Sequence, residues 1–176
     1  EESPREEQWL EAVEREIAEL GVAVAAARAE TVARLSAIIA DSADESSPFP
    51  HASIALEGEL DALVASRSAL DAEDGYRLLL RQGRLRDRAA GRTLVGPQAS
   101  DLKVRHAQKN LPAELGSTGE QKALLIGLVL AHARLVAAMS GLPPLVLLDE
   151  IAAHLDPRRR AALYEGLIGL GCQVWM

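Results

Sequence analysis

Apolar residues recur with a helical period through the first forty residues of the chain. They stand three or four positions apart, at Trp9, Val13, Ile17, Leu20, Val24, Ala27, Thr31, Leu35 and Ile38. This spacing places their side chains on one face of a helix. Ser3 and Pro4 precede the repeat and suit the N-cap and the first helical position. We therefore predict one long helix that packs along this face, either as an arm projecting from a globular body or as an ordinary surface helix.

Turn-forming residues divide the middle of the chain into shorter elements. The predicted elements are a loop over 41–50, a strand over 52–56, a helix over about 71–90, strands over 93–95 and 102–105, and a turn over 96–100. The composition changes near Gly91, where this strand-rich stretch begins.

The second predicted helix carries arginines along one face. These residues, which we name the arginine stripe, are Arg77, Arg81, Arg84 and Arg88, and Arg92 continues their spacing. Residues three or four apart lie on the same side of a helix. The stripe has two interpretations, a DNA-binding surface or a solvated face partly paired with Asp74 and Asp87.

Charge and composition narrow the class of protein. The chain has 176 residues, 48% hydrophobic, with a formal net charge of -7. This balance argues against a surface coated in positive charge, so any DNA contact must come from local patches. Cys172 is the only cysteine, which excludes an intrachain disulfide.

The sequence also carries expectations about location and completeness. The acidic start, Glu1 to Glu7, does not resemble a signal peptide, and we expect no segment long enough to span a membrane. The prediction is a soluble cytoplasmic protein with no membrane partner. Because the chain opens without Met and ends on an apolar strand, we expect it to be a piece of a longer protein with apolar surface left uncovered.

A loop rich in small and polar residues leads into the most apolar helix. This serine loop, Gly116–Lys122, precedes a predicted helix over 123–138. Ser117 suits the N-cap, and Gly119 lets a ligand approach the backbone. The free N–H groups and the dipole of a helix start favour an anion, with phosphate as the natural candidate. The alternative is a plain capping box.

An apolar strand ending in two acids follows. Residues 141–144 end the helix, and Leu145–Leu148 predicts a strand covered on both faces. Asp149 and Glu150 come directly after it, where open α/β sheets bind ligands. Asp149 would hold Mg²⁺ through its hydration shell, and Glu150 would polarise an attacking water. The alternative is that two acids merely end a strand.

A short turn then starts the last helix. Residues 153–156 (Ala-His-Leu-Asp) follow the acid pair, and Asp156 suits the N-cap of a helix whose first residue is Pro157. The order serine loop, apolar strand with Asp-Glu, and Leu-Asp turn into a helix is the order seen in ABC-type ATPases.

The detailed residues resemble the RecF family of bacterial recombination-mediator ATPases. The resemblance is carried by the runs 117–126 and 147–163, by 91–97 and by 100–102. It covers residues 91–176 and implies an α/β fold. Residues 91–176 would form the later half of an ABC-type ATPase head, a P-loop NTPase-like sheet with helices, and residues 1–90 a mainly helical arm domain.

The resemblance implies roles for particular residues. Signature-motif contacts to the γ-phosphate of ATP held by a partner subunit would come from Ser117, Thr118, Gly119 and Glu120. Asp149 would be the Walker B aspartate that holds Mg²⁺, and Glu150 the catalytic glutamate. The D-loop crossing the dimer interface would comprise Ala153, His154, Leu155 and Asp156.

The sequence departs from the family in two places. Gln98 and Ala99 stand where the family usually has His and Arg after the Gly-Pro turn. No G-x-x-x-x-G-K-[ST] phosphate cradle occurs in the chain. We therefore expect that the isolated chain cannot bind the phosphates of ATP through a loop of its own.

The resemblance implies a function for the whole protein. It would form an ATP-dependent homodimer, bind DNA at single-strand gaps or duplex junctions, and assist recombinase loading with RecR/RecO-type mediator proteins in DNA repair, replication and the SOS response. An ATP-gated structural clamp of the chromosome-maintenance type, with incidental hydrolysis, is the alternative. A transporter's ATP-binding subunit is a third option that the long inserted helix disfavours.

Overall fold

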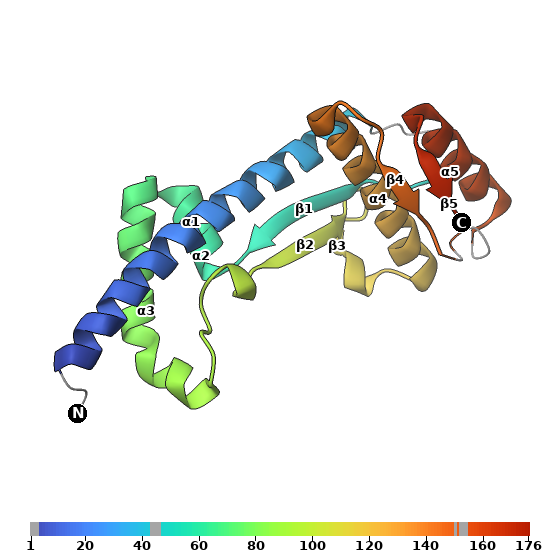
Figure 1. Ribbon diagram of the computed structural model, residues 1–176. Coiled ribbons are helices and arrows are strands. Elements are labelled where there is room, and N and C mark those ends of the chain that lie inside the picture. The colour runs from blue at the N-terminus through green and yellow to red at the C-terminus, as the bar shows by residue number, and fades with distance from the viewer. Residues whose placement is uncertain (1–3, 43–46, 150, 152–154) are drawn as a thin grey trace. The chain divides into compact units, whose positions relative to one another are not determined.

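The computed structural model describes residues 4–42, 47–149, 151 and 155–176, and its fold is mixed α/β (Figure 1). The elements in chain order are α1 (Pro4–Asp41), β1 (Ala52–Glu57), α2 (Glu59–Ser66), α3 (Ala69–Ala90), η1 (Pro97–Ala99), β2 (Asp101–His106), β3 (Leu111–Pro112), η2 (Ala113–Leu115), α4 (Thr118–Ser140), β4 (Leu145–Leu147), α5 (Pro157–Leu170) and β5 (Gln173–Trp175). The predicted α/β class is confirmed.

The chain forms two compact units, each built from two segments. Unit 1 comprises residues 1–32 and 55–103, and unit 2 comprises residues 33–54 and 104–176. The sequence predicted a contiguous division after residue 90. The observed units differ because α1, β1 and β2 each contribute residues to both.

In unit 1 the predicted long helix is present, but the predicted buried face of α1 is wrong. Trp9, Leu20 and Val24 are exposed. The face that packs is made of small residues, including Ala18 and Ala25. The other core residues of this unit are Val22, Leu60, Ala72, Tyr76, Leu80 and Val95. The small side chains are buried in place of the large ones because they let α1 pack closely against its neighbours.

Tyr76 lies at the centre of unit 1. A β-carbon on Gly21 would lie 2.7 Å from Cε1 of Tyr76, so only glycine leaves room for the ring. The Tyr76 hydroxyl donates to the Val95 carbonyl at 2.9 Å. Burial, with the nearby charge of Asp87 as a smaller cause, raises the pKa of Tyr76.

The strand predicted over 93–95 is also wrong. These residues form a loop held by side chains. Leu94 N–H donates to Asp87 Oδ1 at 3.2 Å, and Gln98 donates to the carbonyls of Thr93 and Val95 at 3.1 and 3.2 Å. Because side chains satisfy its backbone, the segment needs no strand partner.

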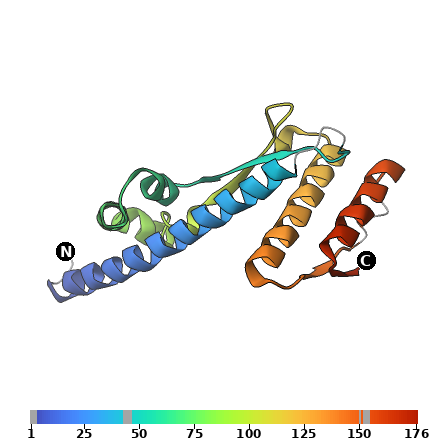
Figure 2. The ribbon, with the colours of Figure 1, turned by 90° about the horizontal axis from the view of Figure 1, so that it is seen from above.

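The core of unit 2 lies between α4, α5 and one face of a two-stranded sheet. Figure 2 shows α4 and α5 side by side. The buried cluster contains Phe49, Ala123, Ile126, Leu130, Ala133, Val146, Leu148, Leu155, Leu163 and Leu167. Strands β4 and β5 are parallel, with Val146 opposite Val174.

A second sheet has the order β1-β2-β3, in which β2 and β3 are antiparallel.

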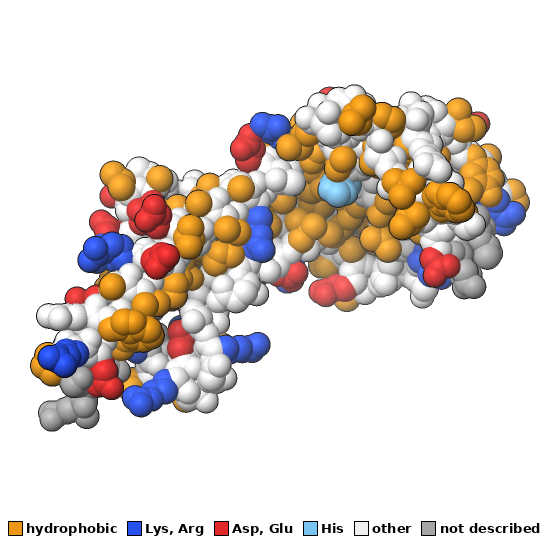
Figure 3. All heavy atoms as spheres, in the orientation of Figure 1, with side chains coloured by type: hydrophobic (Ala, Val, Ile, Leu, Met, Phe, Trp, Pro, Cys, Tyr) orange, Lys and Arg blue, Asp and Glu red, His pale blue; other side chains and the backbone are white. Residues whose placement is uncertain are grey.

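Strand β4 is covered on one face, which corrects the prediction of two covered faces. Val146 and Leu148 are buried, whereas Leu145 and Leu147 are exposed. Leu147 pairs with Trp175, which is also exposed. Hydrophobic side chains gather over α4, β4 and β5 in Figure 3. The expected uncovered apolar surface is therefore present.

Helix α4 corrects another expectation. Its 23 residues are long and apolar enough to cross a membrane by length and composition, whereas the sequence predicted no such segment. Its buried residues, including Ala123, Ile126 and Leu130, belong to the core of unit 2. A core helix passes the same test of length and composition as a membrane span.

The arginine stripe of α3 is paired mainly with acids of α1. Arg77 contacts Asp74 at 3.2 Å, and Arg81 contacts Glu7 and Glu11 at 3.4 and 3.5 Å. These exposed pairs contribute little stability.

Arg84 makes a different kind of contact. Its Nε and Nη2 donate to the two carboxylate oxygens of Glu14 at 2.6 and 2.9 Å. Only 17% of the Arg84 side chain and 11% of the Glu14 side chain are exposed. Two parallel charge-assisted bonds in this shielded position tie α3 to α1.

Replacing Arg84 with Ala is expected to lower the free energy of unfolding by about 3 kcal/mol, because the shielded Glu14 carboxylate loses its cation. Urea denaturation measures the change. The matched control is Arg77→Ala, which removes an exposed pair and should cost about 0.5 kcal/mol or less. Equal small losses in the two variants would contradict a structural role for Arg84.

Candidate phosphate site at the start of α4

Helix α4 begins with a capping box. Ser117 has extended backbone angles, and its Oγ accepts from the Glu120 N–H at 3.4 Å. The Glu120 carboxylate reaches back and accepts from the Ser117 N–H at 2.9 Å and from the Ser117 hydroxyl at 2.8 Å. Both the N-cap prediction and the capping-box alternative are thus realised at the same residues.

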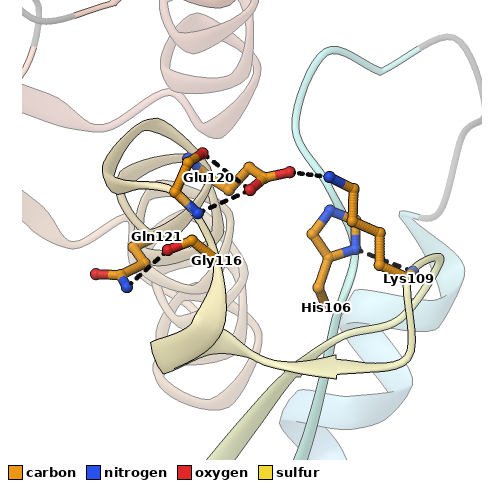
Figure 4. Close-up of polar contacts among 6 residues, drawn as sticks. His106, Lys109, Gly116, Glu120 and Gln121 are labelled. Atoms are coloured by element: carbon orange, nitrogen blue, oxygen red, sulfur yellow. Dashed lines mark hydrogen bonds and ion pairs between the residues drawn. The ribbon is translucent and has the colours of Figure 1, made fainter.

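Lys109 adds a cation to this network. It lies in the turn between β2 and β3 and forms an ion pair with Glu120 (Figure 4). The Lys109 N–H donates to Nδ1 of the buried His106 at 3.4 Å. The bond from Lys109, followed by the bonds from the Ser117 N–H and hydroxyl, lowers the pKa of Glu120 from 4.5 to about 2.

Gln121 holds the backbone segment that precedes α4. Its side-chain amide donates to the carbonyls of Glu114 and Gly116, both at 3.0 Å. The carbonyls before the helix are therefore satisfied, and the serine loop has a defined path into α4.

The tip of the serine loop stays open. Ser117, Thr118 and Gly119 are exposed. A β-carbon on Gly119 would meet only Arg159 Nη1, at 4.0 Å. The first N–H groups of a helix lack partners within the helix, so this end can accept an anion.

Arg159 brings the start of α5 beside the serine loop. Its Nε donates to the Pro48 carbonyl at 3.2 Å and lies 3.6 Å from Asp156 Oδ2. Asp156 is the N-cap of α5, as predicted, and accepts from the Arg159 N–H at 3.0 Å. That bond is the main cause that lowers the pKa of Asp156.

The acid pair and the predicted D-loop are described in part. Asp149 follows β4 and is exposed. Glu150, Ala153 and His154 lie outside the described residues. Leu155 is buried in the core of unit 2.

The Mg²⁺ site predicted at Asp149 would have one carboxylate among the described residues. Among them, no group of three His, Cys, Asp or Glu lies close enough to hold a metal. An exposed carboxylate completed by water and phosphate oxygens is a usual arrangement for this ion, and Asp149 fits it.

The sequence predicted no role for Lys109, Gln121 or Arg159. Their partners are found only in the folded chain, since Arg159 and Pro48 are separated by 111 positions. The residues that were predicted, Ser117 and Asp156, act on neighbours three positions away.

The depressed pKa of Glu120 predicts a pH-dependent stability. Ionised Glu120 favours the folded state above its ordinary value of 4.5, and this contribution is lost as the pH falls through about 2. We expect the difference in unfolding midpoint between the native chain and the Glu120→Gln variant to shrink as the pH falls from 4.5 toward 2. Urea denaturation across pH 2–6 measures it, and parallel profiles for the two proteins would contradict the assignment.

The chain is similar to known proteins over most of its length. Residues 13–170 match the family model described as AAA domain, putative AbiEii toxin, Type IV TA system. The DNA replication and repair protein RecF of Mesorhizobium japonicum is 59% identical over 172 residues, 98% of this chain and 45% of the relative. RecF of Brucella abortus is 56% identical over 171 residues, 97% of this chain and 44% of the relative. The chain thus spans somewhat less than half the length of these relatives.

Solved structures support the fold. A structure of the recombination mediator protein RecF-ATPrS in the RecFOR pathway gives a TM-score of 0.79 at 20% identity, over 97% of this chain and 44% of that one. A RecF-ATP structure from the same pathway gives 0.76 at 19% identity, over 96% and 44%. The resemblance to the RecF family, predicted over residues 91–176, is therefore confirmed, and the similarity extends over nearly the whole chain. The family match over residues 13–170 shows that the chain belongs to the AAA domain family.

Proposed function

We propose that the chain is the carboxy-terminal portion of a RecF-like, ATP-dependent DNA repair and recombination protein. The observation that carries the proposal is the start of α4. There the signature-like sequence exposes Ser117, Thr118 and Gly119 at a helix N-terminus, with Arg159 beside them. The similarity to RecF proteins over 98% of the chain supports the same function.

The shared nucleotide site would use this loop in trans. The Ser117 hydroxyl and the first N–H groups of α4 would donate to the γ-phosphate of ATP bound by a second subunit. Asp149 would orient the water shell of Mg²⁺, and Glu150 would polarise the attacking water. Mg²⁺, when bound, would neutralise charge on the phosphates. Ala153 to Asp156 would cross the dimer interface as the D-loop.

On this proposal, ATP binding closes a homodimer on DNA at single-strand gaps or duplex junctions, and hydrolysis releases it. The protein would act in the cytoplasm with RecR/RecO-type mediators to assist recombinase loading. The RecFOR pathway of the similar solved structures supports this assignment. Within the arginine stripe, Arg77, Arg81 and Arg88 remain candidates for DNA contact, whereas Arg84 is committed to Glu14.

Within the described residues, the helices are short compared with the coiled coils of a chromosome-maintenance clamp, which supports the proposal of a repair ATPase. Helix α1 has 38 residues and α3 has 22. A clamp of that type would need hundreds of residues of heptad repeat.

Replacing Glu150 with Gln in the full-length protein should trap the ATP-bound dimer on DNA, because the attacking water is no longer polarised. Analytical ultracentrifugation with gapped DNA and ATP measures the trapped complex. The matched control is Glu165→Gln, an exposed acid on α5. No trapping, or equal trapping by the control, would count against the proposed roles.

The isolated 176-residue chain should neither hydrolyse ATP nor bind it tightly, because it contains no phosphate cradle of its own. A phosphate-release assay and isothermal titration calorimetry measure these properties. Turnover by the pure chain that disappears in Glu150→Gln would refute the expectation.

A further inference from the structure

A carboxylate lies at the place where the phosphate is proposed to bind. Glu120 Oε2 is 2.8 Å from the Ser117 hydroxyl oxygen and 2.9 Å from the Ser117 nitrogen. These are donors that a γ-phosphate would approach. An uncompensated negative charge so close to them would repel the incoming anion. The capping box and the phosphate site therefore compete for the same donors.

Lys109 is placed to remove this conflict. Its ammonium binds the other carboxylate oxygen of Glu120, Oε1, and so leaves Oε2 for the cap. The ion pair forms on the side of α4 that faces the β2–β3 turn (Figure 4). The cation offsets the charge of Glu120 without occupying the serine loop.

The turn that presents Lys109 is itself held firmly. Asn110 N–H donates to the Ala107 carbonyl at 3.3 Å, and Arg105 donates to the carbonyl and side-chain oxygen of Asn110 at 2.7 and 2.9 Å. The Lys109 N–H bond to His106 adds a further anchor. A lysine on a bound turn has a smaller range of positions than one on a free loop.

Phosphate binding requires the Ser117 hydroxyl to change its acceptor. In the described structure this hydroxyl donates to Glu120 Oε2. When it turns to a phosphate, Glu120 keeps only the Ser117 N–H and Lys109 as donors. Among the described residues, Lys109 is then the cation that holds this carboxylate in place.

We propose that Lys109 is a positioning residue of the phosphate site: its ammonium offsets and orients the Glu120 carboxylate, so that the serine loop can bind a phosphate while α4 stays capped. This inference rests on the proposed function, because the phosphate is that of ATP held by a second subunit. Lys109 acts through Glu120 and not by touching the nucleotide.

A double-mutant cycle in the full-length protein tests the proposal. The readout is the ATP concentration that gives half-maximal dimerisation, followed by analytical ultracentrifugation. Lys109→Ala should raise this concentration about tenfold, because Glu120 is left uncompensated. Glu120→Gln keeps a capping-box residue without the charge. The double variant should therefore need several-fold less ATP than Lys109→Ala and lie within about twofold of Glu120→Gln alone. Lys109→Arg should remain close to the native protein.

Controls separate charge compensation from a purely structural contact. Lys103→Ala removes another exposed lysine of an ion pair, with Asp101 and Glu57, and should leave the midpoint unchanged. If Lys109 only fastened the turn to α4, the double variant would stay as weak as Lys109→Ala. That result, or a native midpoint in Lys109→Ala, would overturn the proposal. A native protein that does not dimerise with ATP would instead overturn the proposed function as well.

Discussion

The backbone N–H groups at the start of α4 have no carbonyl partners within the helix, and the way they are satisfied determines what this part of the molecule can do. Ser117 and Glu120 satisfy two donors from within the loop. Thr118 and Gly119 remain exposed, with the positive end of the helix dipole behind them. The capping box that starts the most apolar helix of the chain therefore lies beside the exposed donors to which we propose that a phosphate binds. Stability and proposed binding have one physical origin here.

Unit 2 arranges its other elements around this helix start. Arg159 connects the first turn of α5 with the segment at Pro48, and Lys109 connects the β2–β3 turn with Glu120. Lys109 and Arg159 thus flank the serine loop from two other elements, the β2–β3 turn and α5. Beneath them, α4 and α5 share the apolar core with one face of the β4–β5 sheet. A packed base thus supports a polar rim, the usual construction of a site that must hold a charged ligand.

How far the sequence predicted this structure depended on the range of the interaction. Helix starts at Ser117 and Asp156 were predicted because a cap acts on residues three positions away. The length of α1 was also predicted, but its buried face was not. The apolar period correctly indicated a helix, whereas close packing selected the face of small residues around Gly21, where the ring of Tyr76 leaves no space for a larger side chain. The apolar run predicted the position of strand β4, but a uniformly apolar run does not indicate which face of the strand is covered by other elements.

The loop after α3 has a consequence for sequence variation. Gly96 has φ of 142°, and a side chain there would overlap the hydroxyl of Tyr76. The bend is therefore enforced by glycine and by the tyrosine beneath it. Gln98 contributes hydrogen bonds to the same loop, while Ala99 is exposed and its side chain has no polar group. A substitution at position 99 can consequently change the functional group that the loop exposes. The path of the loop backbone would stay the same.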